Sequence, residues 1–336
     1  MKKTATILLV WTLSLLAWGG VRAANPEGEV RNLIFMVGDG MGLAHVSMLM
    51  VENGYAPTSF DRAQSVGLVC TRSANNRVTD SAAAATALAT GHKTGNGTIG
   101  QSLEGERYES LMMRAEKAGL RSGIVVSCYL QHATPAAFYA HVARRGDVDT
   151  ITRDLLASGV DVLFGGGRKW LAEECSDGGT YFDAFRRRGY TVVDRFEQTD
   201  TLHSGRVLGA FAEKHLEAAP RRGDYLPRAT RKALELLTAD DSLHRGWMLL
   251  VEGSLIDMAA HDNDAERLLA EMRDFNAAVG AQQVAGKIRQ DDRTLPAGGN
   301  AVFSTLARSG SVDMDFVVEV GSAAGKDGFD GVVGDV

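Results

Sequence analysis

Short runs of apolar residues alternate along the chain with longer segments in which apolar and polar positions recur at helical spacing. Runs of strand length occupy residues 32–37, 65–70, 122–129, 160–164 and 247–251. Continuous apolar runs of this length are typical of strands buried on both faces of a sheet. Helices are expected over residues 43–53, 81–90, 108–119, 135–145, 230–239 and 264–287. The alternation predicts an α/β fold: a doubly wound, mostly parallel central sheet with helices on both faces.

Polar residues follow three of these apolar runs. Asp39 follows the first run within a glycine-rich turn, His132 and Thr134 come after the third, and Glu252 comes after the fifth. Open α/β sheets bind their ligands at the carboxyl ends of their strands. Asp39 could instead be a turn residue that caps the following helix, and its position alone leaves both interpretations open.

An alanine-rich segment, residues 78–91, predicts a helix that begins at Ser81. Alanine has the highest helix propensity, Thr79 and Asp80 are good N-cap residues, and Gly91 is a typical C-terminal stop. The Ser81 hydroxyl would then lie among unpaired N–H groups at the positive end of the helix, where a phosphate oxygen binds. The alternative is a small-residue helix packed in the core, with Ser81 incidental.

Asp257 and His261 form a second candidate site with Glu252. They are four residues apart, so on a helix they share one face, and both could reach one metal ion. Glu252 precedes them at a strand end, where its oxygen suits a hard cation such as Mg²⁺. An exposed helical pair is the alternative, but it does not explain three ligand-type residues directly after a buried strand.

The helix expected over residues 135–145 ends in Arg144 and Arg145. Each guanidinium could be a solvated residue favoured by the helix dipole, or it could bind a phosphate through two hydrogen bonds. His141, on the apolar face of the same helix, is interpreted as a core histidine and not as a ligand.

Composition narrows the range of functions. The chain has 336 residues, of which 45% are hydrophobic, so it can build a large core in one or two domains. Its net charge is −6, and no basic run is longer than the triplet at residues 186–188. Nucleic-acid binding is therefore not expected.

Residues 1–23 read as a secretory signal peptide. Lys2 and Lys3 form the basic segment, an apolar run extends over residues 7–18, and residues 21–23 provide a small-residue cleavage site. An uncleaved membrane anchor is the alternative, but the run is short for a membrane span. We therefore expect a mature chain that starts near Ala24, is periplasmic or secreted, and has no membrane association after cleavage.

The remainder reads as one α/β domain over residues 24–295, with residues 182–230 as an insertion and residues 296–336 as an atypical C-terminal tail. The chain contains three cysteines, Cys70, Cys128 and Cys175, whose spacing matches no zinc motif. In an oxidising compartment one pair could form a disulfide. Buried free thiols are equally consistent with the sequence.

Five short strings carry a resemblance to a known family. They are Gly-Asp-Gly-Met-Gly at 38–42, Val-Thr-Asp-Ser-Ala-Ala at 78–83, His-Ala-Thr-Pro-Ala at 132–136, Asp-Val-Leu-Phe-Gly-Gly-Gly at 161–167, and Val-Glu-Gly at 251–253. Each alone is weak, but together and in this order they are specific. Over residues 30–295 the chain resembles the alkaline phosphatase family, which are exported metal-dependent phosphomonoesterases. The resemblance implies small-molecule phosphate monoesters as substrates, two Zn²⁺ and one Mg²⁺ as cofactors, and a homodimer as one option for the oligomeric state.

The resemblance also implies roles for the matching residues. Ser81 would be the nucleophile that becomes phosphoserine, with its hydroxyl at a zinc ion, and Arg145 would bind the phosphate oxygens. Asp39 would bridge the magnesium and one zinc. The other ligands would be Thr134 and Glu252 at the magnesium, His132 there directly or through a neighbouring group, and Asp257 and His261 at the other zinc.

The C-terminal part departs from the family pattern. The family supplies an Asp-His pair from a later strand to the zinc beside the nucleophile, and a final histidine to the other zinc. Here the sequence reads Pro-Ala-Gly-Gly-Asn at residues 296–300 and Arg-Ser-Gly at residues 308–310, and no histidine follows His261. A gene error and real divergence both explain this departure.

Three functions therefore remain: a phosphomonoesterase of the family type, whether or not the missing zinc ligands impair it, a vestigial metal- and phosphate-binding protein, or a related phosphodiesterase or sulfatase. Arg145 and the helix that begins at Ser81 favour monoesters over the third.

Overall fold

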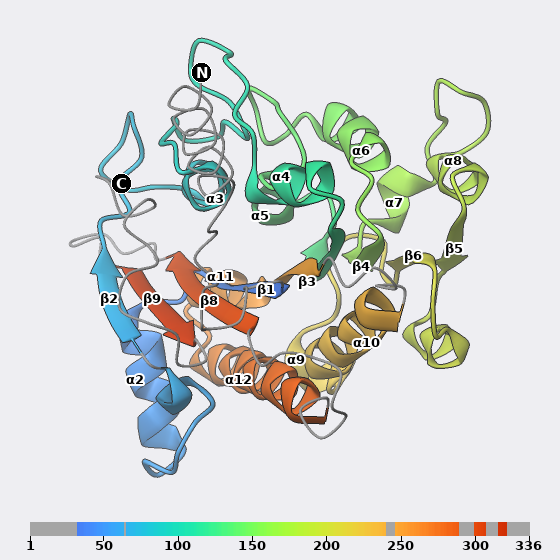
Figure 1. The fold of residues 1–336 in the computed structure, drawn as a ribbon. Helices are drawn as coiled ribbons and strands as arrows, with labels where there is room; N and C mark the ends of the chain where they lie inside the picture. The colour runs from blue at the N-terminus through green and yellow to red at the C-terminus, as the bar shows by residue number, and fades with distance from the viewer. Residues whose placement is uncertain (1–31, 64, 240–245, 289–298, 307–314, 321–336) are drawn as a thin grey trace, which may run out of the picture.

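The computed structural model describes residues 32–63, 65–239, 246–288, 299–306 and 315–320. The signal peptide predicted at residues 1–23 lies outside them. The described residues form a nine-stranded sheet with helices on both faces (Figure 1). The strand order is β2-β9-β8-β1-β7-β3-β4-β6-β5. The strands are β1 (Asn32–Asp39), β2 (Ser65–Val69), β3 (Arg121–Tyr129), β4 (Val162–Gly166), β5 (Tyr190–Val193), β6 (Arg206–Ala210), β7 (Trp247–Gly253), β8 (Gly299–Leu306) and β9 (Asp315–Val320).

Most neighbouring strands run parallel. β1 pairs with β7 and β8, β3 with β7 and β4, and β6 with β4 and β5, all in the parallel sense. β9 is antiparallel to its neighbours β2 and β8. Every residue of β7 is buried, as a strand covered on both faces must be. The predicted doubly wound, mostly parallel sheet is confirmed.

The helices form two layers, one on each face of the sheet (Figure 1). Helices α3 to α8 cover one face, and their apolar residues pack around Phe138 and Ile124. Helices α2 and α9 to α12 cover the other, around Phe275 and Leu249. Their bounds are α2 (Leu43–Glu52), α3 (Ser81–Thr90), α4 (Leu111–Lys117), α5 (Ala133–Ala136), α6 (Val148–Ala157), α7 (Arg168–Leu171), α8 (Tyr181–Arg187), α9 (Ala219–Arg222), α10 (Tyr225–Ala239), α11 (Leu255–His261) and α12 (Ala265–Ile288).

The prediction of a helix over residues 135–145 is wrong. Only the short α5 forms, with His132 as its N-cap residue. The chain beyond it is drawn into an antiparallel bridge between Ile99 and Val142, and the Arg145 N–H donates to the carbonyl of Gly97. These contacts come from a distant loop, so a local helical pattern could not reveal them.

The sheet extends past two of the predicted boundaries. Residues 182–230, expected as an insertion, instead contribute β5 and β6 to the sheet. β8 and β9 follow residue 295, so the sheet continues beyond the predicted domain boundary there. That boundary and the tail assignment remain predictions, because residues 289–298, 307–314 and 321–336 lie outside the described part.

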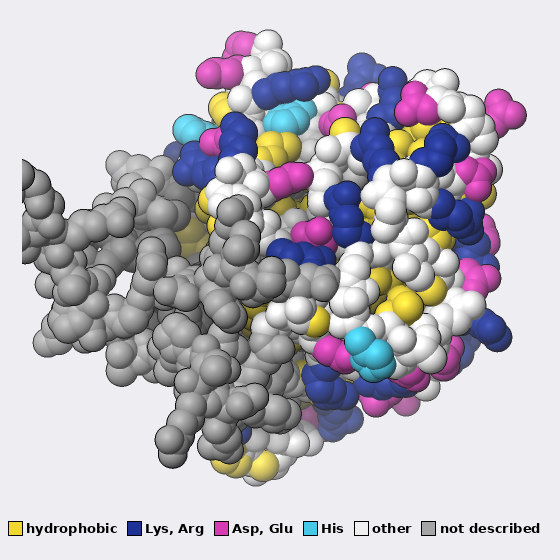
Figure 2. All heavy atoms as spheres, turned by 45° about the vertical axis from the view of Figure 1, so that its right-hand side comes forward, with side chains coloured by type: hydrophobic (Ala, Val, Ile, Leu, Met, Phe, Trp, Pro, Cys, Tyr) yellow, Lys and Arg dark blue, Asp and Glu magenta, His cyan; other side chains and the backbone are white. Residues whose placement is uncertain are grey.

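The surface and the cysteines complete the description. Figure 2 shows Lys and Arg side chains interspersed with Asp and Glu over the face it presents. Among the described helices, none combines the length and apolar character needed to cross a membrane.

The three cysteines are free thiols; Cys70 is exposed, whereas Cys128 and Cys175 are buried.

Candidate active site

Three adjacent central strands, β1, β7 and β3, end beside one another and supply the candidate residues. Asp39 is the last residue of β1, and Glu252 is the penultimate residue of β7. The parallel register pairs Gly38 with Gly253 and Val126 with Glu252. The side chains that follow these positions therefore gather at one edge of the sheet, where open α/β sheets bind ligands.

Ser81 is the first residue of α3, as predicted, and its hydroxyl reaches the end of β1. Asp80 caps the helix by accepting the N–H of Ala83 at 3.0 Å, and Gly91 ends it in the left-handed conformation with φ +76°. The Ser81 hydroxyl donates to the Asp39 carboxylate, with Oγ 3.1 Å from Oδ1 and 3.2 Å from Oδ2. A hydroxyl at a helix N-terminus thus meets a buried carboxylate.

Arg145 is held beside this serine by Asp80. Its Nη1 donates to Asp80 Oδ2 at 3.2 Å, and the Gly97 N–H donates to the same oxygen at 3.0 Å. Its Nη2 donates to His132 Nε2 at 3.2 Å. About a third of the Arg145 side chain, 32%, is exposed, so it can still contact a ligand. The sequence indicated Asp80 as a cap but gave no sign that it also anchors the guanidinium.

The carboxylates at this edge are buried without enough positive charge to balance them. Asp39 is 2% exposed and Glu252 is fully buried. Burial raises the pKa of Asp39 well above its usual value, as do the charges of Asp257 and Glu252, while Arg145 and Ser81 oppose this. Burial raises the pKa of Glu252 to about 7 against polar neighbours that include Thr134. A bound cation would oppose both shifts, because its charge favours the ionised carboxylates.

Asp257 and His261 share one face of α11, as their spacing predicted. His261 Nε2 lies 3.5 Å from Asp257 Oδ1, and the imidazole is 47% exposed. Asp257 packs closely against the turn after β1, because this turn contains Gly40, with φ +65°. A Cβ atom at Gly40 would lie 2.7 Å from the Asp257 Cα. Only glycine combines this backbone conformation with such a close approach.

Two buried oxygen atoms have no hydrogen-bond partner, which suits a metal site. They are Thr134 Oγ1 and Glu252 Oε1. Burial, Arg145 and His215 hold the pKa of His132 well below its usual value, so the imidazole is neutral and able to bind a metal. Native proteins satisfy nearly all such groups, so their grouping here indicates an ion.

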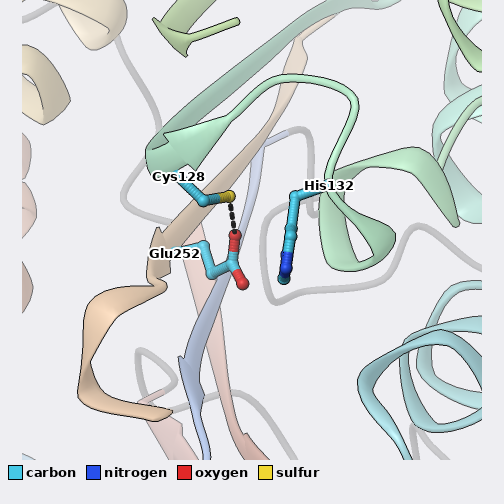
Figure 3. A group of neighbouring side chains, drawn as sticks. All are labelled: Cys128, His132 and Glu252. Carbon is cyan, nitrogen blue, oxygen red and sulfur yellow. Dashed lines mark hydrogen bonds between the residues drawn. The ribbon is translucent and has the colours of Figure 1, made fainter. Parts of the chain in front are cut away.

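One further ligand-type side chain points into this group. Sulfur, nitrogen and oxygen atoms of Cys128, His132 and Glu252 lie within 4.8 Å of one another (Figure 3). Sequence spacing did not indicate Cys128, because the cluster arises only where β3 pairs with β7.

The predicted residues all join one network of contacts. Hydrogen bonds, ion pairs and mutual electrostatic effects connect them through Asp39, which faces Ser81, Arg145, Asp257 and Glu252. The other three join through these residues: His132 through Arg145, Thr134 through Glu252, and His261 through Asp257. Their individual roles remain predictions.

Comparison with known proteins gives consistent results. The family model described as alkaline phosphatase matches residues 30–298. Alkaline phosphatase 4 of Bacillus subtilis is 34% identical over 272 residues, which cover 76% of this chain and 58% of that protein. Streptomycin-6-phosphate phosphatase of Streptomyces griseus is 32% identical, over 82% of this chain and 74% of that protein.

Solved structures agree. A cold-active alkaline phosphatase of Shewanella sp. matches with a TM-score of 0.74 and 36% identity, over 83% of this chain and 68% of that one. The alkaline phosphatase of the Antarctic bacterium TAB5 matches with a TM-score of 0.78 over 87% of this chain and 92% of that one; at 24% identity this likeness concerns the fold alone. The chain spans 58% and 62% of two alkaline phosphatases of Bacillus subtilis, less than two thirds of each. Because the family model covers most of the chain, the chain belongs to the alkaline phosphatase family.

Proposed function

We propose that this protein hydrolyses small-molecule phosphate monoesters through a phosphoserine formed on Ser81. The observation that carries the proposal is the contact between the Ser81 hydroxyl and the Asp39 carboxylate, with Oγ 3.1 Å from Oδ1, at the N-terminus of α3. A serine nucleophile must lose its proton, and the charge of the phosphoryl group must be balanced. Here the Asp39 carboxylate accepts a hydrogen bond from the serine hydroxyl, and the positive end of α3 lies beside it.

The chain's own residues divide these tasks. The Ser81 oxygen attacks phosphorus, the ester P–O bond breaks, and the released alcohol takes up a proton in place of the one that the serine loses. Asp39 holds the hydroxyl in one orientation through the hydrogen bond that it accepts. N–H groups of the first turn of α3 face the transferred group with partial positive charge. Arg145, fixed by Asp80, binds non-bridging oxygens with its fork of donors. Water then hydrolyses the phosphoserine and regenerates the serine.

The residues present fit three divalent cations, and the family resemblance implies that these are two Zn²⁺ and one Mg²⁺. Asp39, Thr134 and Glu252 would hold the cation that the resemblance implies to be Mg²⁺, with His132 beside it, and Asp257 and His261 would hold one Zn²⁺. Asp39 and Ser81 would face the other Zn²⁺. The fit is supported by the unpartnered buried atoms Thr134 Oγ1 and Glu252 Oε1. When bound, these cations neutralise the phosphoryl oxygens and stabilise the attacking and leaving oxygens.

We also propose that the protein is exported to the periplasm or secreted. The proposal rests on the basic residues, apolar run and small-residue site within residues 1–23. Export would suit a hydrolase of phosphate esters that are met outside the cytoplasm.

A second candidate function is a metal- and phosphate-binding protein with little turnover. One observation favours it: no histidine follows His261 within these 336 residues, so the later ligands that the family resemblance implies have no counterpart among them. Zinc affinity depends directly on ligand number. A phosphodiesterase or sulfatase is a third candidate.

Hydrolysis of p-nitrophenyl phosphate at alkaline pH, with metal content measured in the same samples, tests the proposal. Ser81→Ala should lose at least about 1,000-fold in rate. Thr90→Ala is the matched control, because it alters the other end of α3, where its hydroxyl donates to the Thr86 carbonyl and accepts from the His92 N–H. Acid-quenched wild type should retain phosphate on protein, and Ser81→Ala should not. Equal rates for wild type and Ser81→Ala would support the second candidate, and faster hydrolysis of a phosphodiester or sulfate ester would support the third.

A further inference from the structure

The Cys128 thiol lies inside the candidate metal site. Its Sγ is 3.4 Å from Glu252 Oε2, to which it donates a hydrogen bond, and both side chains are fully buried. Figure 3 shows the thiol and the carboxylate pointing toward each other beside the His132 ring. Sulfur, nitrogen and oxygen donors from β3, the turn before α5, and β7 thus face one small volume.

The fold directs this thiol toward Glu252. The pairing of β3 with β4 shifts register between Val125 and Tyr129, and such irregularities re-aim side chains next to functional sites. The Cys128 N–H donates to Ser254 Oγ at 3.2 Å, which ties the irregular end of β3 to the residue after β7. Cys128 is therefore held in this position by two strands.

One neighbouring atom lacks the partner that a cation would supply. Glu252 Oε1 is buried without a hydrogen bond, and the Glu252 and His132 side chains are both at least nine-tenths buried. His132 Nε2 accepts a hydrogen bond from Arg145, so a cation bound by the imidazole would displace that guanidinium. The usual interpretation of a buried free cysteine, as a small apolar residue, accounts for the burial of Cys128 but leaves the orphaned Glu252 oxygen unexplained. A metal ion shared by the three side chains explains both observations.

The donor set determines which cation fits. Magnesium requires a near-octahedral shell of oxygen atoms and binds thiolates poorly. A thiolate, an imidazole and a carboxylate are the donors of zinc sites, at about 2.0–2.3 Å from the ion. The present separations, within 4.8 Å, need to contract by only about 1 Å to bring these donors around one such ion.

We propose that Cys128, His132 and Glu252 form a site for a thiophilic divalent cation such as Zn²⁺, in the place where the proposed function puts Mg²⁺. On binding, the Cys128 sulfur releases its proton to solvent and bonds to the metal. The proposal rests on the proposed function only in expecting a metal at this edge of the sheet. It assigns Cys128 a role that the family resemblance does not supply.

Cobalt(II) is the probe, because thiolate–cobalt bonds give a charge-transfer band in the near ultraviolet. Full-length protein is stripped of metal and titrated with cobalt, and bound cobalt is measured in parallel. We expect the band in wild type and in Cys175→Ala, a matched control at another buried free thiol. It should be absent from Cys128→Ala and Cys128→Ser. A band in either Cys128 variant, its loss in Cys175→Ala, or bound cobalt without a band in wild type would overturn the proposal.

A second variant keeps the test valid if Cys128 substitutions do not fold. Cys70→Ala combined with Cys175→Ala leaves Cys128 as the only thiol, and this protein should retain the whole band. In competition, wild type should prefer zinc over magnesium at this site, and Cys128→Ser should lose at least about 10-fold in zinc affinity. Unchanged zinc affinity would contradict thiolate binding.

The two proposals fail separately. Ser81→Ala should keep the cobalt band even though hydrolysis is lost. A band without hydrolysis in wild type would contradict the proposed function alone, and hydrolysis without a band would contradict Cys128 ligation alone.

Discussion

Arg222 on α9 is a buried cation whose removal should destabilise the protein strongly. Its side chain is 4% exposed, and its Nη2 donates to Glu271 Oε2 and Asp274 Oδ2 on α12, each at 2.6 Å. Nη1 adds a bond to Glu271 Oε1 at 3.0 Å. The neighbouring Arg221 is 76% exposed and pairs with the exposed Glu217. Two adjacent arginines therefore offer a matched comparison.

The expected cost follows from what remains after Arg222→Met. Two carboxylates, 1% and 7% exposed, would lose their only buried counter-charge among the described residues. Breaking a buried ion pair by removing one partner costs about 3–5 kcal/mol. That is at least a fifth of the roughly 5–15 kcal/mol that stabilises a typical protein. Arg221→Met should have no measurable effect, since exposed ion pairs contribute little.

Urea unfolding at pH 7, followed by tryptophan fluorescence, measures both changes. The midpoint should fall sharply for Arg222→Met and stay in place for Arg221→Met. Adding Glu271→Gln and Asp274→Asn to Arg222→Met should recover much of the loss, because no carboxylate is then left buried. Equal midpoints for the two arginine variants, or no recovery in the triple variant, would refute the reasoning.

Three further outcomes are expected. Gly40→Ala should lower the free energy of unfolding by about 2–4 kcal/mol in thermal melts, because the added Cβ meets Asp257 Cα at 2.7 Å in a left-handed backbone. Gly54→Ala is the control, since φ is +61° there but nothing lies within 4 Å of the added Cβ. A loss for Gly40→Ala no larger than that for Gly54→Ala would contradict this. Burial raises the pKa of Asp274 from 3.8 to about 6, so its protonated form is favoured in the folded state. The contribution of Asp274 to the free energy of unfolding should be fully present below pH 4 and should fall by about 3 kcal/mol as the pH rises to about 6. Urea midpoints measured across this pH range should show the decline in wild type and lack it in Asp274→Asn. A chelator should lower the melting temperature of wild type by more than that of Glu252→Gln, since only wild type holds the cation at Glu252. Equal shifts in the two proteins would argue against a metal there.

Much of the architecture could be predicted because its signals are local. Apolar runs that end in glycine or polar residues located the central strands, and the order of strands and helices predicted the parallel sheet. The start of α3 at Ser81 and its stop at Gly91 followed from capping chemistry. The face shared by Asp257 and His261 followed from helical spacing.

What could not be predicted depends on contacts between distant segments. The chain after α5 leaves the helix because Val142 pairs with Ile99, which no local pattern encodes. Cys128 looked like an ordinary apolar position until the pairing of β3 and β7 brought it to Glu252. Asp80 showed its capping role in the sequence, but its bond to Arg145 spans 65 residues.

The order of strands in the sheet also determines which parts of the protein can unfold locally without disrupting the candidate active site. The candidate residues are attached to β1, β7 and β3, which have neighbours on both sides, whereas β2 and β5 are edge strands. Edges and the elements packed on them open at lower free energy than the middle of a sheet. Amide exchange should therefore be fast at β5, while the backbone amides near Asp39 and Glu252 stay protected. Local unfolding of the sheet edge would then leave the candidate active-site residues in place.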